Sequence, residues 1–310
     1  MFFTKLWTYF IVNVTCIVNK IAIIQLNRRK IIMKKIFIIT LIGLCTISIV
    51  TNACWPSFSW FSWLDKSCKT IHGSGTPKAK TITTKGIKNI VISSIGKLSI
   101  KQCENEKNCT EQLTITADDN MFDYLEQTIS GDTLTLKIKN NTSCSIKTPL
   151  EYQMTVRDIN KIDSSGSILI DINDITTDKF TLDSTGSSKT NINKIKARLL
   201  SIKSSGSSKI NISKLDNQEI TIVSSGSSRL QLSGTTVNQN IELSGSSQYD
   251  TQSLNSTKAK VKGYGAIKMH LNVSSIIQGE LSGASSLFYN GQHNPTVNVQ
   301  TSGSSTINKR

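Results

Sequence analysis

Histidines and serines, the residues that most often perform catalysis, are not arranged for it in this 310-residue chain. His72, His270 and His293 lie far apart in sequence without an evident carboxylate partner, so we expect each of them on the surface. None of the many serines stands in the GxSxG arrangement of a nucleophilic serine, and the sequence lacks the glycine patterns of phosphate-binding and dinucleotide-binding loops. We therefore predict no catalytic residue, no metal site, no cofactor and no enzymatic activity.

Two carboxylates do recur at a fixed spacing. Asp163 and Asp183 each stand three residues before a glycine of the repeat described below, and Lys203 holds the next equivalent position. If the repeats stack, the two carboxylates are neighbours, which favours a bound cation or a raised pKa. The alternative is that Lys203 neutralises Asp183 and the row is purely structural. A polysaccharide-cleaving enzyme would need several acids in one groove, and this pair is the only hint of one.

Four basic residues keep the same spacing. Lys189, Lys209, Arg229 and Lys268 each follow a repeat glycine by three residues. Stacked repeats would place them in a row with about 4.8 Å between neighbouring strands, a spacing that suits a linear anionic polymer. The alternative is that these charges keep a repetitive sheet soluble and discourage strand pairing. These four residues are the candidate ligand-binding site.

The spacings come from an internal repeat in which a glycine stands among small residues, as in the segment SSGSS. Such regularity over a third to a half of a chain is typical of stacked repeat architectures. The repeat glycines lie 18 to 20 residues apart, at Gly166, Gly186, Gly206, Gly226, Gly245, Gly265, Gly283 and Gly303.

Apolar residues follow the same period. In Ile170-Asp171-Ile172, as in the next repeats, apolar residues four and six positions after the glycine flank a polar one, which predicts a strand with one buried face. Each repeat is predicted as a strand, a tight turn at the glycine and a second strand. One repeat cannot bury its apolar row, but stacked repeats can. We predict an all-β fold: a parallel β-helix, or solenoid, of about eight 20-residue coils after a β-rich N-terminal segment of the same domain.

An export signal begins at Met33. Two lysines precede an apolar run over 36–50, and small residues lead to Cys54, so we predict a signal peptide over 33–53. The alternative is a membrane anchor, although the run is shorter than the roughly 20 residues of a membrane span. We expect residues 1–32 to lie upstream of the true start at Met33, or else to form an extra hydrophobic segment.

Cleavage before Cys54 would leave five of the seven cysteines, an odd number for an oxidising compartment. Lipidation of Cys54 would leave four for two disulfides, although threonine stands where a lipoprotein signal usually has leucine. A soluble exported protein is the alternative. Cys103 and Cys109 flank a short charged stretch, and we expect a local disulfide between them. The cysteines lack the CxxC spacing of zinc sites.

The segment 54–69 is rich in tryptophan and phenylalanine. Tryptophan favours the membrane–water interface, so this linker is expected either to lie on a bilayer or to pack on the domain or a partner. Residues 1–53 hold seven of the 36 basic residues and none of the 21 acidic ones, so the remainder carries a net charge of +8. Such a charge attracts polyanions weakly, and we predict no nucleic-acid partner.

The region before the repeats adds a family resemblance. It contains the opening motif Gly73-Ser74-Gly75, an IVIS strand with a glycine hairpin at Gly96, the segment Ala117–Glu126, and a GDTLTL hairpin at Gly131. With the SSGS repeats, these elements resemble the head GIN domain family of autotransporter adhesins over about 70–310. The resemblance implies an all-β fold with β-helix character, an envelope or extracellular setting, and no catalytic residues.

Together these observations predict an exported protein of the periplasm, outer membrane or cell surface. It would act as a non-enzymatic adhesion, binding or scaffold module. The expected partners are an anionic polysaccharide or a surface protein, with the N-terminal segment contacting the membrane. The alternatives are a carbohydrate-active β-helix enzyme and a purely structural envelope protein.

Overall fold

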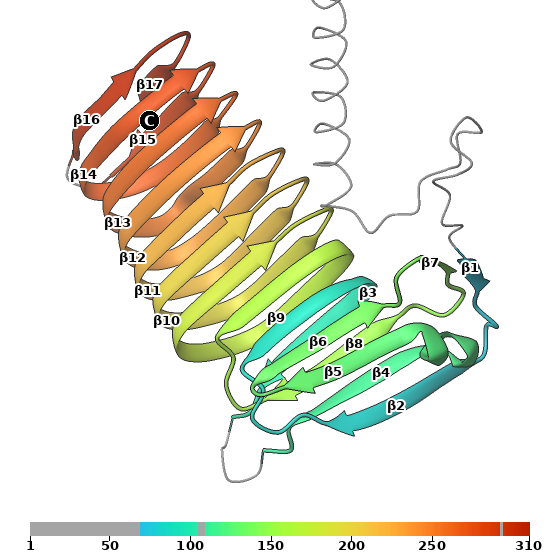
Figure 1. Ribbon diagram of the computed structural model, residues 1–310. Helices are drawn as coiled ribbons and strands as arrows, with labels where there is room; N and C mark the ends of the chain where they lie inside the picture. Colours follow the sequence, from blue (N-terminus) through green and yellow to red (C-terminus); the bar gives the residue numbers. More distant parts are fainter. Residues whose placement is uncertain (1–68, 105–108, 292–293) are drawn as a thin grey trace, which may run out of the picture. The chain divides into compact units, whose positions relative to one another are not determined.

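The computed structural model describes residues 69–104, 109–291 and 294–310. Figure 1 shows a β-rich N-terminal layer followed by a stack of coils. The predicted signal peptide, the tryptophan-rich segment and Cys54 lie outside the described residues. Within the described ranges, no helix is long and apolar enough to cross a membrane.

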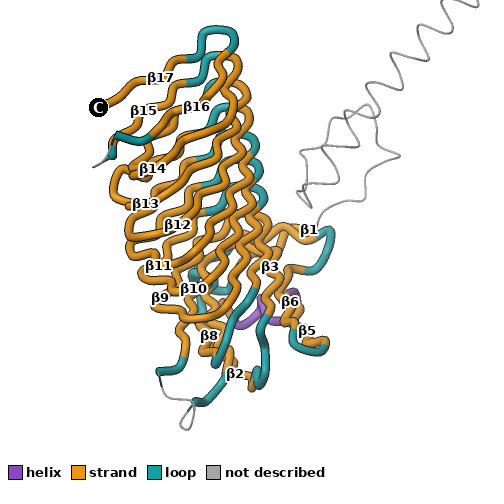
Figure 2. Tube along the Cα trace, turned by 90° about the vertical axis from the view of Figure 1, so that its left-hand side faces the viewer, coloured by secondary structure: helices purple, strands orange, loops and turns teal. Residues whose placement is uncertain are grey.

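The stack is a parallel β-solenoid, as the repeat predicted, with about seven turns where about eight coils were expected. Successive coils pair in parallel along one continuous sheet path (Figure 2). The strands of the stack are β3 (Asn89–Gln102), β9 (Lys161–Ser184), β10 (Lys189–Ser204), β11 (Lys209–Ser224), β12 (Arg229–Gly245), β13 (Gln248–Gly265), β14 (Lys268–Gly283), β15 (Ser286–Asn290), β16 (Thr296–Thr301) and β17 (Thr306–Lys309).

The core of the stack is the set of inward rows that the sequence predicted. Ile170, Ile210, Leu230 and Met269, each four residues after a repeat glycine, are all fully buried. Burying one such side chain is worth about 1.5–3 kcal/mol. Because the coils are in register, each row forms a continuous buried column that is mainly apolar, with Thr190 between Ile170 and Ile210 as a polar member of this row. Burial along these columns stabilises the stack.

The predicted tight turn at the glycine is present between successive strands, but each strand also contains two corners that the prediction missed. In β10 the alternation of buried and outward residues breaks at 193–194 and again at 198–199. Pairing with β11 resumes directly after each break, at Lys194 and at Leu199. The chain thus turns two corners inside the ladder and a third at the SSGSS turn. We call the segments equivalent to 189–192 the first side, and those equivalent to 199–203 the third side.

The SSGSS turns stack on one another along one edge of the solenoid (Figure 2). Gly206 has a φ of 87°, and a Cβ on it would lie 2.6 Å from the carbonyl oxygen of Gly186 in the preceding coil. That carbonyl accepts a hydrogen bond from the backbone N–H of Ser207 at 2.9 Å. Only glycine satisfies both the left-handed conformation and this close approach, which explains why it recurs.

The shorter repeats, of 19 and 18 residues, are accommodated by bulges. Register shifts fall between Ile212 and Leu215, and between Gln231 and Gly234, as β12 joins its neighbours. Two further shifts between 251 and 258 join β13 to β14. All of them lie after the first side and before the third, so the two outer faces keep their register.

Strands before the repeats form a mixed layer on the outer edge of β3. Parallel strands from this layer pair with each half of β3, and the outermost strand exposes Lys78 and Lys80, charges that discourage further strand addition. The elements of the layer are β2 (Pro77–Thr83), β4 (Gln112–Asp118), the 3-10 helix η2 (Asp119–Tyr124), β5 (Leu125–Ser130), β6 (Thr133–Ile138) and β8 (Glu151–Val156). β1 (Lys69–His72) and β7 (Thr142–Ser145) pair in parallel as a separate two-stranded sheet.

One of the two hairpins expected in this region is present. β5 and β6 pair antiparallel around Gly131, as predicted. The hairpin expected at Gly96 is wrong, because β3 runs unbroken through it and pairs there with Ile168. A Cβ on Gly96 would lie 2.1 Å from the carbonyl oxygen of Leu150. This glycine therefore allows a close approach of the chain entering β8 and does not reverse the strand.

The Gly73-Ser74-Gly75 motif wraps a buried carboxylate. Asp118 accepts backbone hydrogen bonds from Gly75 at 2.9 Å, Lys147 at 3.0 Å and Thr148 at 3.2 Å. Hydrogen bonding from Thr148, with that from Lys147 and Gly75, outweighs burial and holds the pKa of Asp118 below its ordinary value. A Cβ on Gly73 would lie 1.8 Å from the carboxylate, so this close wrapping requires glycine.

Candidate functional site

The four predicted basic residues lie in one row on the first side of the solenoid. Lys189, Lys209 and Arg229 are direct neighbours on β10, β11 and β12. Gln248 continues the row on β13 and is followed by Lys268 on β14. We call these five residues the basic row. Neighbouring coils are about 4.8 Å apart, so the row offers a cationic or polar group at each step.

The basic row is open to solvent. Its four cationic side chains are exposed, and none of them forms an ion pair within the described parts of the chain. The Arg229 Nε donates a hydrogen bond to the Gln248 Oε1 at 2.8 Å, which holds the guanidinium along the row. These positive charges are therefore available to an anionic ligand.

A second outward row runs beside the basic row, two residues further along each coil. Asp171, Asn191 and Asn211 are in register, and each asparagine Nδ2 donates to the preceding side chain, at 2.8 and 2.9 Å. Burial raises the pKa of Asp171, but the hydrogen bond from Asn191 and the Lys97 ammonium at 3.0 Å outweigh it, so the pKa is lowered. We call these three residues the amide row.

The amide row had served only as evidence for strand alternation and was missed as part of this face. Its signal was available, because polar residues stand at the fifth position after every repeat glycine except Gly283, which Phe288 follows there. An ordered ladder of amide groups beside cations supplies both hydrogen-bond donors and acceptors. The first side therefore presents cations along one line and, along the next, two amides that follow the Asp171 carboxylate, which is paired with Lys97.

A shallow groove borders the basic row where the coils pass through the SSGSS turns. It has a volume of about 620 Å³. Its lining combines serines of the turns with cations of the row, including Ser207, Ser227, Ser246, Lys209, Arg229 and Lys268. An anionic polymer lying on the row would thus meet hydroxyl groups along one border and amides along the other.

The inner serines of the turns serve a different purpose. Ser204, Ser208 and Ser228 are buried and hydrogen-bond to one another through their hydroxyl groups. Hydroxyl groups satisfied in this way inside a core are structural.

Of the three histidines, His270 is buried, so the prediction that it lies on the surface is wrong. It lies on the first side of β14, where its Nδ1 is 2.5 Å from the Gln252 Nε2 and its ring packs 4.9 Å from that of Phe288. Burial, with the nearby Arg310 charge, lowers its pKa. His72 is exposed, whereas His293 lies outside the described residues.

The two recurring carboxylates, Asp163 and Asp183, each lie beside a lysine. Asp163 forms an ion pair with Lys161 at 2.8 Å, and Asp183 pairs in register with Lys203 on the next coil. Among the described residues, no three histidine, cysteine or acidic side chains are grouped so that they could hold a metal ion. These contacts favour the structural role for the aspartate row.

The structure joins Cys103 to Cys109 by a disulfide that closes a short loop after β3. Cys144 in β7 carries a free, partly buried thiol whose pKa is raised by burial. Cys54, the candidate for lipidation, lies outside the described residues.

The same fold occurs in solved structures. One neighbour, described as a "putative lipid binding protein" from Parabacteroides distasonis, has a TM-score of 0.71 and 20% identity, covering 78% of this chain and 100% of its own. A "putative adhesin" from Parabacteroides merdae has a TM-score of 0.65 and 16% identity, covering 78% and 99%. A "putative adhesin" from Bacteroides fragilis has a TM-score of 0.59 and 19% identity, covering 77% and 100%.

No curated protein matches the chain significantly. The model of one family does match it, over residues 101–293, and that family is described as "Putative auto-transporter adhesin, head GIN domain". The match covers more than half of the chain and includes most of the solenoid and its basic row. The chain therefore belongs to the head GIN domain family.

Proposed function

We propose that this protein is exported to the cell envelope or surface and acts there as a non-enzymatic adhesion module that binds anionic polysaccharide along its basic row. The observation that carries the proposal is the register of Lys189, Lys209 and Arg229 on adjacent coils, exposed and without ion-pair partners within the described residues. The family description, with its adhesin name, supports the coarser statement that the role is adhesion.

The row suits a linear ligand because its groups repeat along a straight line. A polymer with an anionic group on each sugar can contact several coils at once. Each contact on an exposed face is weak, at most about 1 kcal/mol, so affinity must come from several contacts made together. A short or neutral sugar would bind this row poorly.

The amide row and the serine groove add groups that recognise hydroxyls. Sugar hydroxyls both donate and accept hydrogen bonds, and so do asparagine amides and serine hydroxyls. A polyanion without hydroxyl groups would use the charges alone. This difference favours a polysaccharide over other anionic polymers, including nucleic acids. The segment before residue 69 would supply export and, through Cys54 or the tryptophans, membrane attachment.

The test uses protein produced from its full-length sequence and applied to immobilised polygalacturonate and neutral dextran. The proposal expects retention on polygalacturonate alone, reversed by salt because exposed charges are screened. The variant Lys189→Glu/Lys209→Glu/Arg229→Glu should lose retention. The flow-through is assayed for new reducing ends, and their appearance would favour the enzyme alternative.

The matched control changes the same charge on other parts of the coils, as Lys179→Glu/Lys194→Glu/Lys214→Glu. All three lysines are exposed and lie off the first side. The control should bind as the wild type does. Equal losses in both triple variants would mean that net charge and not the row binds the polymer. Absence of retention in the wild type would contradict the proposal.

A further inference from the structure

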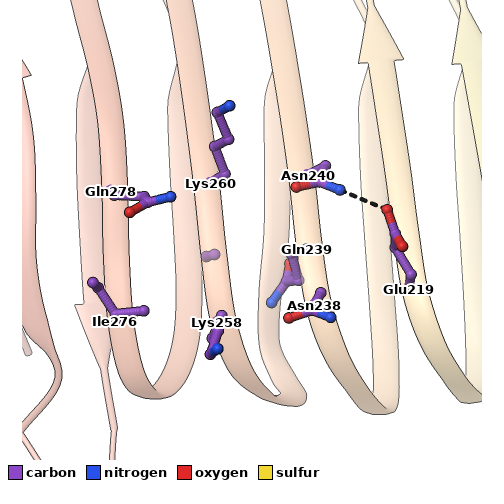
Figure 3. Close-up of a pocket in the computed structure, with 9 residues that line it drawn as sticks. Glu219, Asn238, Gln239, Asn240, Lys258, Lys260, Ile276 and Gln278 are labelled. Carbon is purple, nitrogen blue, oxygen red and sulfur yellow. Dashed lines mark hydrogen bonds between the residues drawn. The ribbon is translucent and has the colours of Figure 1, made fainter.

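A second concave site lies on the third side of the solenoid, over β11 to β14. Figure 3 shows polar side chains from four neighbouring strands around it. Its volume is about 340 Å³, at the lower end of the roughly 300–1,000 Å³ of small-molecule sites. We call it the side hollow. It is lined by Glu219, Asn238, Asn240, Lys258, Lys260 and Gln278, with Ile276 and the inward residues Gln239 and Ala259 behind them.

The hollow coincides with a departure from the repeat. Leu200 and Ile220 occupy one inward row on the earlier coils, but Gln239 and Ala259 occupy it beneath the hollow. Ala259 is the smallest residue of this row and is 2% exposed. Gln239 is 1% exposed and accepts a hydrogen bond from the Tyr249 hydroxyl at 2.9 Å.

The buried side-chain amide of Gln239 is held by hydrogen bonds at both its oxygen and its nitrogen. The Gln239 Nε2 donates to the Ser256 Oγ at 2.7 Å, and the Ser256 Oγ donates to the Asn272 carbonyl at 2.8 Å. A satisfied polar network in a core holds one arrangement of its members. The floor of the hollow is therefore preformed and rigid.

The rim presents unused polar groups. Within the described residues, the side chains of Asn238, Lys258, Lys260 and Gln278 make no hydrogen bond or ion pair. Figure 3 shows the one contact between rim residues, in which the Asn240 Nδ2 donates to the Glu219 Oε1 at 2.8 Å. That contact leaves the Asn240 Oδ1 and the second Glu219 oxygen free to accept.

These groups define a ligand. Two ammonium groups two residues apart on one strand, without an acidic partner, attract one carboxylate or sulfate. Three amides and one carboxylate beside them match a set of hydroxyl groups, because they donate and accept in a small space. We propose that the side hollow is a second binding site, and that it takes a single acidic sugar with its anionic group between Lys258 and Lys260.

The side hollow is separate from the basic row. The row lies on the first side and the hollow on the third, and no residue of the basic row lines the hollow. The row needs a polymer for affinity, whereas the hollow encloses one ring in a preformed setting. The two sites can therefore be lost independently, and the inference does not rest on the proposed function.

The test is a titration of isotope-labelled protein, made from its full-length sequence, followed by amide NMR. The probes are D-glucuronate, neutral D-glucose, and acetate as an anion without hydroxyls. We expect glucuronate to shift the amide signals of Asn238, Asn240 and Gln278 in a saturable way. Glucose and acetate should each bind at least about fivefold more weakly, since glucose lacks the carboxylate and acetate lacks the hydroxyl groups.

The variant Asn240→Ala/Lys260→Ala should weaken glucuronate binding at least tenfold. The same pair of residue types at a corner, changed as Asn193→Ala/Lys194→Ala, should not. Should the first variant fold poorly, Lys260→Gln removes the charge but keeps a long polar side chain, and it should still weaken binding severalfold. The basic-row triple reversal should bind glucuronate as the wild type does. Shifts away from the hollow, no saturation, or equal binding of acetate would overturn the assignment.

Discussion

Arg229 and Gln248, on neighbouring coils, are joined by a hydrogen bond from the arginine Nε to the glutamine Oε1 at 2.8 Å. Gln248 holds the one position between Arg229 and Lys268 that lacks a charge. The contact keeps the guanidinium in line across this gap. The basic row therefore runs across five successive coils without a break, although one of its five positions, Gln248, is uncharged.

A cation at the one uncharged position of the basic row should strengthen polyanion binding. Gln248→Lys adds a cation in the gap, and the expected result is a several-fold lower dissociation constant for polygalacturonate, since one exposed contact is worth up to about 1 kcal/mol. Isothermal titration calorimetry measures this. Gln218→Lys, at an exposed corner, adds the same charge away from the row and should change the affinity little. A larger gain from the corner variant would argue against the row.

The stacked glycine turns should be intolerant of a methyl group. Gly206→Ala places a Cβ 2.6 Å from a carbonyl oxygen of the neighbouring coil. Gly86→Ala is the matched control, because Gly86 also has a positive φ but nothing within 4 Å of its added Cβ. We expect about 1–2 kcal/mol of backbone strain in both variants and about 1–3 kcal/mol more from overpacking at Gly206. Urea unfolding compares them, and equal losses would contradict the close-approach explanation.

The buried serines should show strong non-additivity. Ser204→Ala removes a shared partner and leaves the hydroxyls of Ser208 and Ser228 incompletely satisfied, at a cost of about 1–3 kcal/mol. Removing all three hydroxyls leaves no unpaired group among them. The triple alanine variant should therefore lose less free energy of unfolding than the sum of the three single variants. Additive losses, measured by urea unfolding, would count against a connected hydroxyl cluster.

The carboxylate of Asp118 should make stability depend on acid pH. Its pKa is lowered in the folded protein from an ordinary value of 3.8, so its contribution is fully present above pH 4. The contribution is lost as the pH falls through the folded pKa. Asp118→Asn should be less stable than the wild type at pH 7, and the difference should shrink below pH 4. Melting temperatures at a series of pH values test this, and a constant difference would rule it out.

The repeat architecture was predictable because small residues and glycine mark each turn and apolar residues return with the same period. Register follows from that periodicity, so the positions of Lys189, Lys209 and Arg229 relative to one another were predictable too. The two corners inside each coil could not be predicted from the sequence. At 193–194 and 198–199 the chain bends without glycine or proline, and the bends come from packing against neighbouring coils.

The other wrong predictions also concern residues whose environment is set by contacts with segments distant in sequence. The family resemblance included a hairpin at Gly96, whereas β3 continues through this residue, and the glycine admits the carbonyl of Leu150. His270 was expected on the surface because it has no evident carboxylate partner in the sequence, but its ring packs against that of Phe288 on the next coil. The side hollow depends on Ala259 lying under Lys258 and Lys260 after two bulges, and no short motif encodes that arrangement.

The most direct measurement compares two lysines of the same strand, Lys209 and Lys214. Both are exposed and lie on β11, but only Lys209 belongs to the basic row. Calorimetric titration of polygalacturonate should show that Lys209→Glu weakens binding at least about fivefold, the equivalent of one lost exposed ion pair. Lys214→Glu should bind nearly as well as the wild type. Equal effects of the two substitutions, or none from Lys209→Glu, would contradict the claim that the in-register row is the binding face.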